Sequence, residues 1–303
     1  MRRMEPWVIA VGLLALSPLD VGATEPPRIV VSKARALSFT RQDAVVGRAE
    51  EVRMGMTMQQ DFYITAPFME PEPIDVSTEM FQAQVFTPLE VKGPLVTKAK
   101  LAYGDVVDVM KDPQGRQKRQ VTVVHQKTYV GEARAGRVEV TDASGQPVPP
   151  EEAELVRKDL DGLGVEDPIA AAFPQGPVKV GTKLDGVARA FEKLLQKGNP
   201  ANVKFRKTRV QLQEIHEDPR GLVGLFLVST TMELAPDEQN PMTTTIAYQG
   251  TMHVLGEGTE LTAFNLQGPV VYTPIPAMKA KGMQVKGKGD SVLFFSVQPV
   301  KKP

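Results

Sequence analysis

The sequence predicts a mainly β protein of the β-rich α+β class. Its antiparallel strands are expected to form curved sheets or an open half-barrel, with two short-to-medium helices in the middle of the chain. Apolar and polar residues alternate with period two over most of the chain, which is typical of strands with one buried face. Turn-like segments join most of these strands, and short connections favour an antiparallel meander. Only two stretches, both within residues 149–200, change to the helical period.

The first β region is predicted over residues 24–148. Alternation is clearest over residues 51–64, where the even positions are mostly apolar. The other predicted strands of this region are residues 98–110, 119–130 and 134–141. Residues 75–86 fit either a strand or a short helix, and the proline-rich residues 67–73 are predicted to form a loop.

The middle segment, residues 149–200, is predicted to be helical and rich in Pro and Gly. Pro149 and Pro150 begin its first helix, which has acidic residues in the first turn and Arg157 and Lys158 in the last. This charge order complements the helix dipole. The second helix is expected to begin at Asp185 as the N-cap and to carry Phe191 and Leu195 on its apolar face. Residues 173–181 are too dense in Pro and Gly to predict regular structure.

The second β region, residues 201–303, is predicted to be an antiparallel meander. Five stretches alternate and are joined by turn-like connections: residues 203–215, 222–234, 242–255, 260–272 and 283–297. Within the last stretch, Lys286-Gly287-Lys288-Gly289-Asp290 is predicted to be a bulge or a hairpin turn.

The first 23 residues have the pattern of a cleaved export signal. Arg2 and Arg3 precede an apolar run over residues 7–16, and Val21-Gly22-Ala23 provides the small residues that a signal peptidase accepts. The apolar run is too short to cross a bilayer, which needs about 20 residues. We therefore expect cleavage after Ala23 and a periplasmic or extracellular protein that is not integral to the membrane.

The composition excludes several classes of function. Lys and Arg together number 36, as do Asp and Glu, and a net charge near zero argues against nucleic acid or a strongly anionic membrane as a partner. The chain has no cysteine, which removes thiol catalysis, thiolate zinc sites and iron–sulfur clusters. We expect no cofactor.

Three methionines at alternate positions are the most prominent candidate site. Met54, Met56 and Met58 share the parity of Val52 and Phe62, so the simplest interpretation is an apolar sheet face within the core. Flexible methionines also line surfaces that bind variable apolar ligands. Because thioethers are soft ligands, a copper(I) site is a third interpretation.

No catalytic signature stands out. The three histidines, His125, His216 and His253, occur singly, without the paired spacing of a typical zinc site. No serine-nucleophile motif is present, and residues 159–166 resemble a calcium loop only superficially, because their glycine and glutamate spacing is wrong. The sequence therefore predicts a protein that is not an enzyme.

The middle of the chain resembles a group of bacterial exported proteins of unknown function. The resemblance rests on a strand, the turn Val140-Thr141-Asp142-Ala143-Ser144-Gly145, a polar helix and Pro177-Val178-Lys179-Val180-Gly181. In those proteins the last motif is usually followed by Asp or Ser and a Trp, whereas Thr182-Lys183-Leu184 follows here. The layout is similar to the open half-barrels of periplasmic lipoprotein carriers, which implies a curved antiparallel sheet that wraps apolar ligands or helices. The resemblance carries no catalytic residues to transfer.

These observations predict an exported binding or carrier protein for an apolar small molecule, a lipid or a hydrophobic protein segment. The expected ligand-binding residues on its apolar faces are Met54, Met56, Met58, Phe62, Phe191 and Leu195. One alternative is a structural or interaction module that binds another protein of the cell envelope. A less favoured alternative is a metal-assisted hydrolase, which requires the three histidines to converge.

Overall fold

The computed structural model describes residues 30–67, 71–197, 199, 201–236 and 242–300. The predicted export signal (residues 1–23) and the polar residues 24–27 that follow it lie outside these ranges. The described residues form a mainly β protein with a large antiparallel sheet that is not closed into a barrel, and this confirms the predicted fold class.

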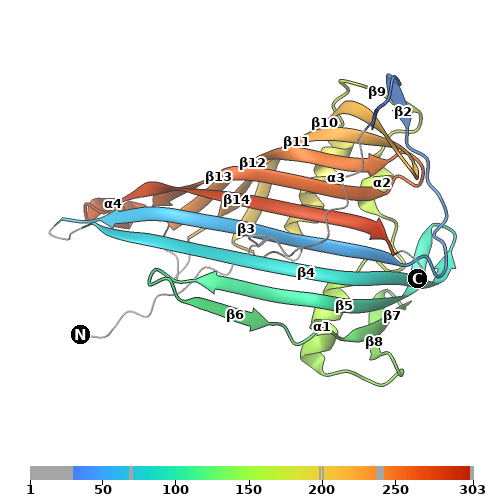
Figure 1. Cartoon of the computed structure of the whole chain (residues 1–303), viewed down its shortest axis with the longest axis horizontal. Helices are drawn as coiled ribbons and strands as arrows, with labels where there is room; N and C mark the ends of the chain where they lie inside the picture. Colours follow the sequence, from blue (N-terminus) through green and yellow to red (C-terminus); the bar gives the residue numbers. More distant parts are fainter. Residues whose placement is uncertain (1–29, 68–70, 198, 200, 237–241, 301–303) are drawn as a thin grey trace.

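Within the described residues, twelve strands form one sheet with the order β1-β10-β11-β12-β13-β14-β3-β4-β5-β7-β8, and β6 pairs with β5 beside β7 (Figure 1). The strands are β1 (Val30–Val31), β3 (Glu50–Thr65), β4 (Glu72–Lys92), β5 (Leu95–Lys111), β6 (Gln117–Val121), β7 (Thr128–Arg134), β8 (Arg137–Asp142), β10 (Val203–Asp218), β11 (Gly221–Leu234), β12 (Met242–Leu255), β13 (Leu261–Pro274) and β14 (Gln284–Pro299). Strands β2 (Ala36–Ser38) and β9 (Pro177–Lys179) form a separate small sheet.

The pairing of β14 with β3 joins the two β regions into a single sheet. It runs antiparallel from Gln284 opposite Thr65 to Pro299 opposite Glu50, over the full length of both strands. The last strand of the chain therefore lies beside one of its first long strands, in the middle of the sheet (Figure 1).

Three helices lie against one face of the sheet, which we call the inner face; the opposite face is the outer face (Figure 1). Helix α3 (Asp185–Gln196) packs over β10, with α2 (Pro168–Ala172) beside it, and α1 (Pro150–Asp159) packs against β7 and β8. A short helix, α4 (Pro276–Ala280), lies between β13 and β14.

The ends of helix α1 agree with the sequence prediction, whereas the start of helix α3 differs from it. Helix α1 has Pro150 in its first turn, with acidic residues there and basic residues in its last turn, as predicted. Helix α3 has Leu184 as its N-cap, so the prediction of Asp185 at that position is wrong by one residue. The reason is that residues 181–184 are hydrogen-bonded along β10, where the Leu184 N–H donates to the Val210 carbonyl, and the helix begins only after this contact.

Three local predictions are corrected. Residues 119–130 form two strands instead of one, because the chain turns between them and the Gln126 N–H donates to the Gly104 carbonyl of β5. The stretch predicted at 134–141 begins later, as β8, after a turn at Ala135 and Gly136. Residues 286–290 form no turn but continue β14, and Gly287 allows a close approach to β3, since a Cβ there would lie 2.3 Å from the Asp61 carbonyl oxygen.

Two large hydrophobic cores lie on the inner face. One lies beneath α2 and α3, and the other lies beneath α1. The first packs α2 and α3 against β10 to β13 and includes Phe191, Phe226 and Met252. The second packs α1 against β5 and β7 and includes Leu101 and Tyr129. A small third cluster lies near α4 and consists of Phe62, Met242 and Met278 with partly buried neighbours.

Two glycines allow neighbouring strands to approach closely between β12 and β13. A Cβ at Gly250 in β12 would lie 1.9 Å from the Asn265 carbonyl oxygen, and one at Gly268 in β13 would lie 2.4 Å from the Ala247 carbonyl oxygen. Both obstacles are backbone atoms of the neighbouring strand, so no side-chain rotation relieves them. Any residue larger than glycine must displace a strand.

We expect Gly250→Ala to lower the free energy of unfolding by about 1–3 kcal/mol, the usual cost of overpacking, or by more. Gly104→Ala in β5 is the matched control, because its Cβ would meet only ordinary van der Waals neighbours at 3.4 Å or more. Urea denaturation of both variants checks this. Equal stability of the two variants would contradict the claim that the neighbouring strand leaves no room for a Cβ at Gly250.

Candidate functional site: an apolar strip between the two cores

The inner face is apolar where β14, β3 and β4 lie between the two cores, and none of the helices that the structure describes encloses it there. Two rows of side chains cross these three strands in register: Phe295–Met54–Gln82 and Leu293–Met56–Met80. Directly opposed residues of antiparallel strands share a face, so these six side chains form one surface. We call it the inner strip.

The inner strip is more accessible than the cores on either side. The Met80 side chain is 43% exposed, which is unusual for a large apolar residue at the centre of a sheet face. Met54, Met56, Gln82, Leu293 and Phe295 are half-buried. Met56, Leu293 and Phe295 pack against the first core, and the Phe295 ring stacks on Phe264 with ring centroids 5.4 Å apart. The strip is therefore supported from one side and accessible around Met80.

The structure places only two of the predicted binding residues, Met54 and Met56, in the inner strip. Met58, on the same strand, is buried, and its thioether accepts a hydrogen bond from the Gln60 amide at 2.8 Å. Phe62 is buried against Tyr272, with ring centroids 5.1 Å apart. These two side chains fill the interior near the α4 end of β3.

Phe191 and Leu195 lie in the first core. Phe191 is fully buried, with its ring edge-on to Phe264 at 5.3 Å, and Leu195 is buried beside it. The helix that carries them covers the sheet, as its apolar face predicts, so their surfaces are occupied by other side chains of the protein.

Four residues of the inner strip were not predicted: Met80, Gln82, Leu293 and Phe295. The first two lie in the stretch that fitted either a strand or a helix, where the face of a side chain could not be assigned. The other two, Leu293 and Phe295, lie at apolar positions of the alternating stretch predicted over residues 283–297. Only the pairing of β14 with β3 brings them beside Met54 and Met56.

A polar group borders the inner strip on the side of α1. Asp159, at the end of this helix, accepts hydrogen bonds from the Tyr103 hydroxyl at 2.6 Å and from the Gln82 amide at 2.9 Å. The carboxylate can be reached by solvent, yet protein surrounds it on most sides, and this desolvation raises the pKa of Asp159 despite the two hydrogen bonds. Gln82 also donates to Gln84 at 2.8 Å.

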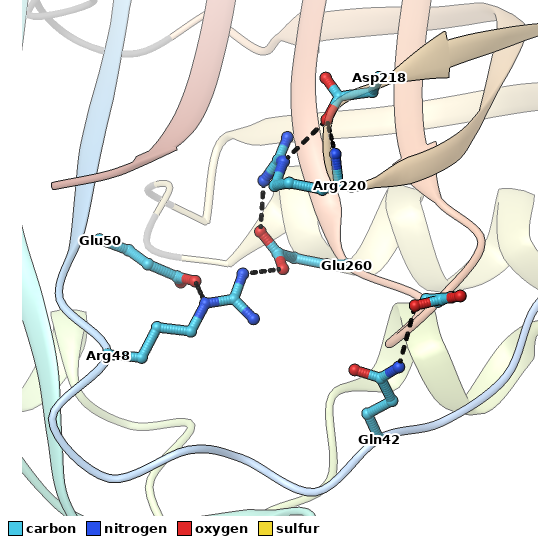
Figure 2. A network of polar contacts seen from close by, with 7 residues as sticks. Gln42, Arg48, Glu50, Asp218, Arg220 and Glu260 are labelled. Atoms are coloured by element: carbon cyan, nitrogen blue, oxygen red, sulfur yellow. Dashed lines mark hydrogen bonds and ion pairs between the residues drawn. The ribbon is translucent and has the colours of Figure 1, made fainter. Parts of the chain in front are cut away.

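Two hollows lie elsewhere, with volumes of about 520 and 1350 Å³. The smaller one, at the end of the sheet near the β12–β13 turn, contains an ion-pair network (Figure 2). Glu260 accepts from Arg48 at 2.8 Å and from Arg220 at 3.2 Å, Arg48 also contacts Glu50 at 2.8 Å, and Arg220 contacts Asp218 at 3.1 Å. The network links the start of β3 to two turns of the second β region.

Glu50 is the least favourably placed anion of this network. Its burial raises its pKa, and the nearby Glu260 carboxylate adds to the effect, while Arg48 and Arg220 oppose it. In contrast, Glu260 contacts both arginines directly. No sequence pattern indicates the network, because Arg48 and Glu260 are 212 residues apart.

The three histidines do not converge. His216 in β10 and His253 in β12 lie near each other on the sheet, with ring centroids 6.4 Å apart, and Glu214 contacts His216 at 2.9 Å. His125 lies beyond β5, between β6 and β7, many strands away. Over the described ranges, no group of three His, Cys, Asp or Glu side chains is arranged to hold a metal ion.

Comparisons with known proteins add no assignment: no family model matches the chain, and no curated protein matches it. None of the helices that the structure describes combines the length and the apolar character needed to cross a bilayer.

We expect Glu260→Gln to lower the free energy of unfolding by about 1–2 kcal/mol, because it weakens two charge-assisted contacts at once. Glu257→Gln is the matched control, since Glu257 lines the same hollow and its carboxylate accepts one long hydrogen bond from a described side chain, that of Gln42, at 3.5 Å. Chemical denaturation of both variants measures the difference. A Glu257 variant as unstable as the Glu260 variant would show that the network itself stabilises little.

The raised pKa of Glu50 predicts a pH-dependent difference between the wild type and Glu50→Gln. A carboxyl whose pKa is higher in the folded state contributes stability below its unfolded pKa, and this contribution is lost as pH rises through the folded pKa. The wild type should therefore gain stability relative to the variant when pH falls from about 7 to about 4. Unfolding curves at several pH values test this, and a constant or opposite difference would contradict it.

Proposed function

We propose that this chain is an exported binding or carrier protein without catalytic activity, and that its inner strip holds an apolar ligand. The observation that carries the proposal is the exposed, methionine-rich surface between two packed cores. A residue such as Met80 loses hydrophobic stabilisation while it remains exposed, and a bound apolar group would cover it. Flexible thioethers also adapt to ligands of different shape.

The size of the inner strip favours a single apolar chain. Its two rows cross three strands, which are about 4.8 Å apart, and successive inward-facing residues along a strand are about 7 Å apart. The exposed surface around Met80 thus has room for one narrow ligand rather than a broad ring system. A larger hydrophobic protein segment would need α1 or α3 to move.

The border of the strip favours a particular polar end on this ligand. Gln82 offers a neutral amide group, and Asp159 offers a carboxylate. A neutral or basic head group would be accepted there, whereas an anionic one would face like charge. The proposed ligand is therefore an apolar chain with a neutral or basic polar end.

The place of action follows from the predicted export signal. A leader with a basic head, a short apolar run and small residues before the expected cleavage point directs a chain out of the cytoplasm. The absence of cysteine from an exported chain favours a bacterial periplasm or exterior, because small secreted eukaryotic domains tend to be rich in disulfides.

We expect Met80→Lys to weaken the binding of a long-chain alkylamine, or of a fluorescent apolar probe such as N-phenylnaphthylamine, by more than about tenfold, because a charge would have to be desolvated and would also repel the ammonium group of the amine. Met80→Leu should bind like the wild type. Val271→Lys is the matched control, since Val271 is another exposed apolar residue, 54% exposed, but lies on the outer face. Fluorescence titration of the mature protein measures all four.

Failure of the wild type to bind either probe would contradict the proposal, as would equal weakening by Val271→Lys. If the wild type binds neither probe but purifies in a stoichiometric complex with an envelope protein, the alternative of an interaction module replaces the carrier.

A further inference from the structure

One row of the inner strip ends in a carboxylate that has no partner. The row Leu293–Met56–Met80 continues in register to Asp108 of β5, so an acid follows three apolar side chains on the same face. Asp108 is half-buried, and it makes no hydrogen bond or ion pair with another described residue. Burial alone raises the pKa of Asp108. A bound cation would relieve the cost of this partly desolvated charge.

The polar residues around this end of the strip leave its negative charge uncompensated. Gln120 of β6 lies directly opposite Asp108, and Lys118 lies two residues away on the same face. Both side chains are exposed, and neither bonds to Asp108 within the described protein. Asp159 accepts hydrogen bonds but forms no ion pair with a described residue, and the adjacent Lys158 pairs within helix α1 instead. Two carboxylates without a cationic partner therefore border the strip on the side of β5.

The accessible groups at this border are hydrogen-bond acceptors. The Gln82 amide nitrogen already donates to the buried Gln84 and to Asp159, so the carbonyl oxygen is the free group of this side chain. The Tyr103 hydroxyl and Gln82 both donate to Oδ2 of Asp159, which leaves Oδ1 without a described donor. Asp108 adds two further carboxylate oxygens. A ligand end that fits this border must therefore donate hydrogen bonds.

A primary ammonium group meets this requirement. It carries a positive charge and three N–H donors and has no acceptor, which complements carboxylate and amide oxygens. A hydroxyl end would bring one donor and no charge, a quaternary ammonium would bring charge without a donor, and a carboxylate would be repelled. The apolar chain would extend from β5 over Met80 and Met56 to Leu293, across three strand spacings or about 14 Å.

We infer that the inner strip takes an apolar chain that ends in a primary ammonium group, held by the free oxygens of Gln82 and Asp159 with Asp108 as its counter-charge. This ligand class rests on the proposed function, since the same strip must hold the chain. Of the neutral and basic ends that the border accepts, only a cation with N–H donors satisfies all three oxygen groups.

Isothermal titration of the mature protein with decylamine, decanol and decyltrimethylammonium, below the concentrations at which they form micelles, tests the inference. The amine is protonated near pH 7, so it differs from the quaternary ion in its N–H donors and from the alcohol in its charge. The wild type should bind decylamine at least about tenfold more tightly than either of the other two ligands, as expected for charge-assisted hydrogen bonds.

Asp108→Asn should lower the affinity for decylamine about tenfold and reduce its preference over decanol, because the variant keeps the shape of the side chain and loses its charge. Asp61→Asn is the matched control. Asp61 is an exposed acid of β3 that also lacks a described partner, but it alternates with the inner-face residues of this strand and so lies on the outer face. Equal effects of the two variants would overturn the inference.

The inference and the proposed function fail in different ways. Equal binding of all three decyl ligands by the wild type would overturn the ammonium end but would leave the apolar site in place. Binding of decyltrimethylammonium as tightly as decylamine would show that N–H donors are not recognised, and would also overturn it. Failure of the wild type to bind the decyl ligands and N-phenylnaphthylamine would contradict the inference and the proposed function together.

Discussion

The pairing of β14 with β3 is the interaction on which the rest of this structure depends. It brings the end of the chain against its beginning over the full length of both strands, and it turns two separate β regions into one sheet. The ion-pair network around Glu260 reinforces this arrangement at one end, since Arg48 precedes β3 while Arg220 and Glu260 belong to the second β region (Figure 2). Loss of the central pairing would leave each half with an unprotected strand edge.

The inner strip exists because of this pairing. Its two rows combine Leu293 and Phe295 of the last strand with residues of β3 and β4, so neither β region alone contains it. Each half of the sheet has its own helical cover, α3 on one side and α1 on the other, and the two cores end before they meet. An uncovered apolar surface at the seam is thus a consequence of how the two halves join. The hollow of about 1350 Å³ differs, because it lies over strands of the second β region and the segment before α3.

Much of the fold could be predicted from the sequence, because period two and turn residues are local signals. The five stretches expected between residues 203 and 297 correspond to β10 to β14, with small differences at their ends, and both main helices lie where the helical period begins. The pairing of β14 with β3, the neighbours of Met54 and the ion pairs of Glu260 depend on contacts between distant residues. No local pattern encodes them. Phe191 and Leu195 were chosen correctly as the apolar face of a helix, but this pattern does not distinguish a side chain that fills a core from one that lines a binding site.

The central claim, that the inner strip binds an apolar ligand, is tested most directly by methyl NMR of the protein labelled at its methionine methyl groups. During titration with a long-chain alkylamine, the signals of Met54, Met56 and Met80 should shift together and saturate. Those of the buried Met58, Met232 and Met252 should change little. Unchanged signals from the three strip methionines, with or without shifts elsewhere, would contradict the account.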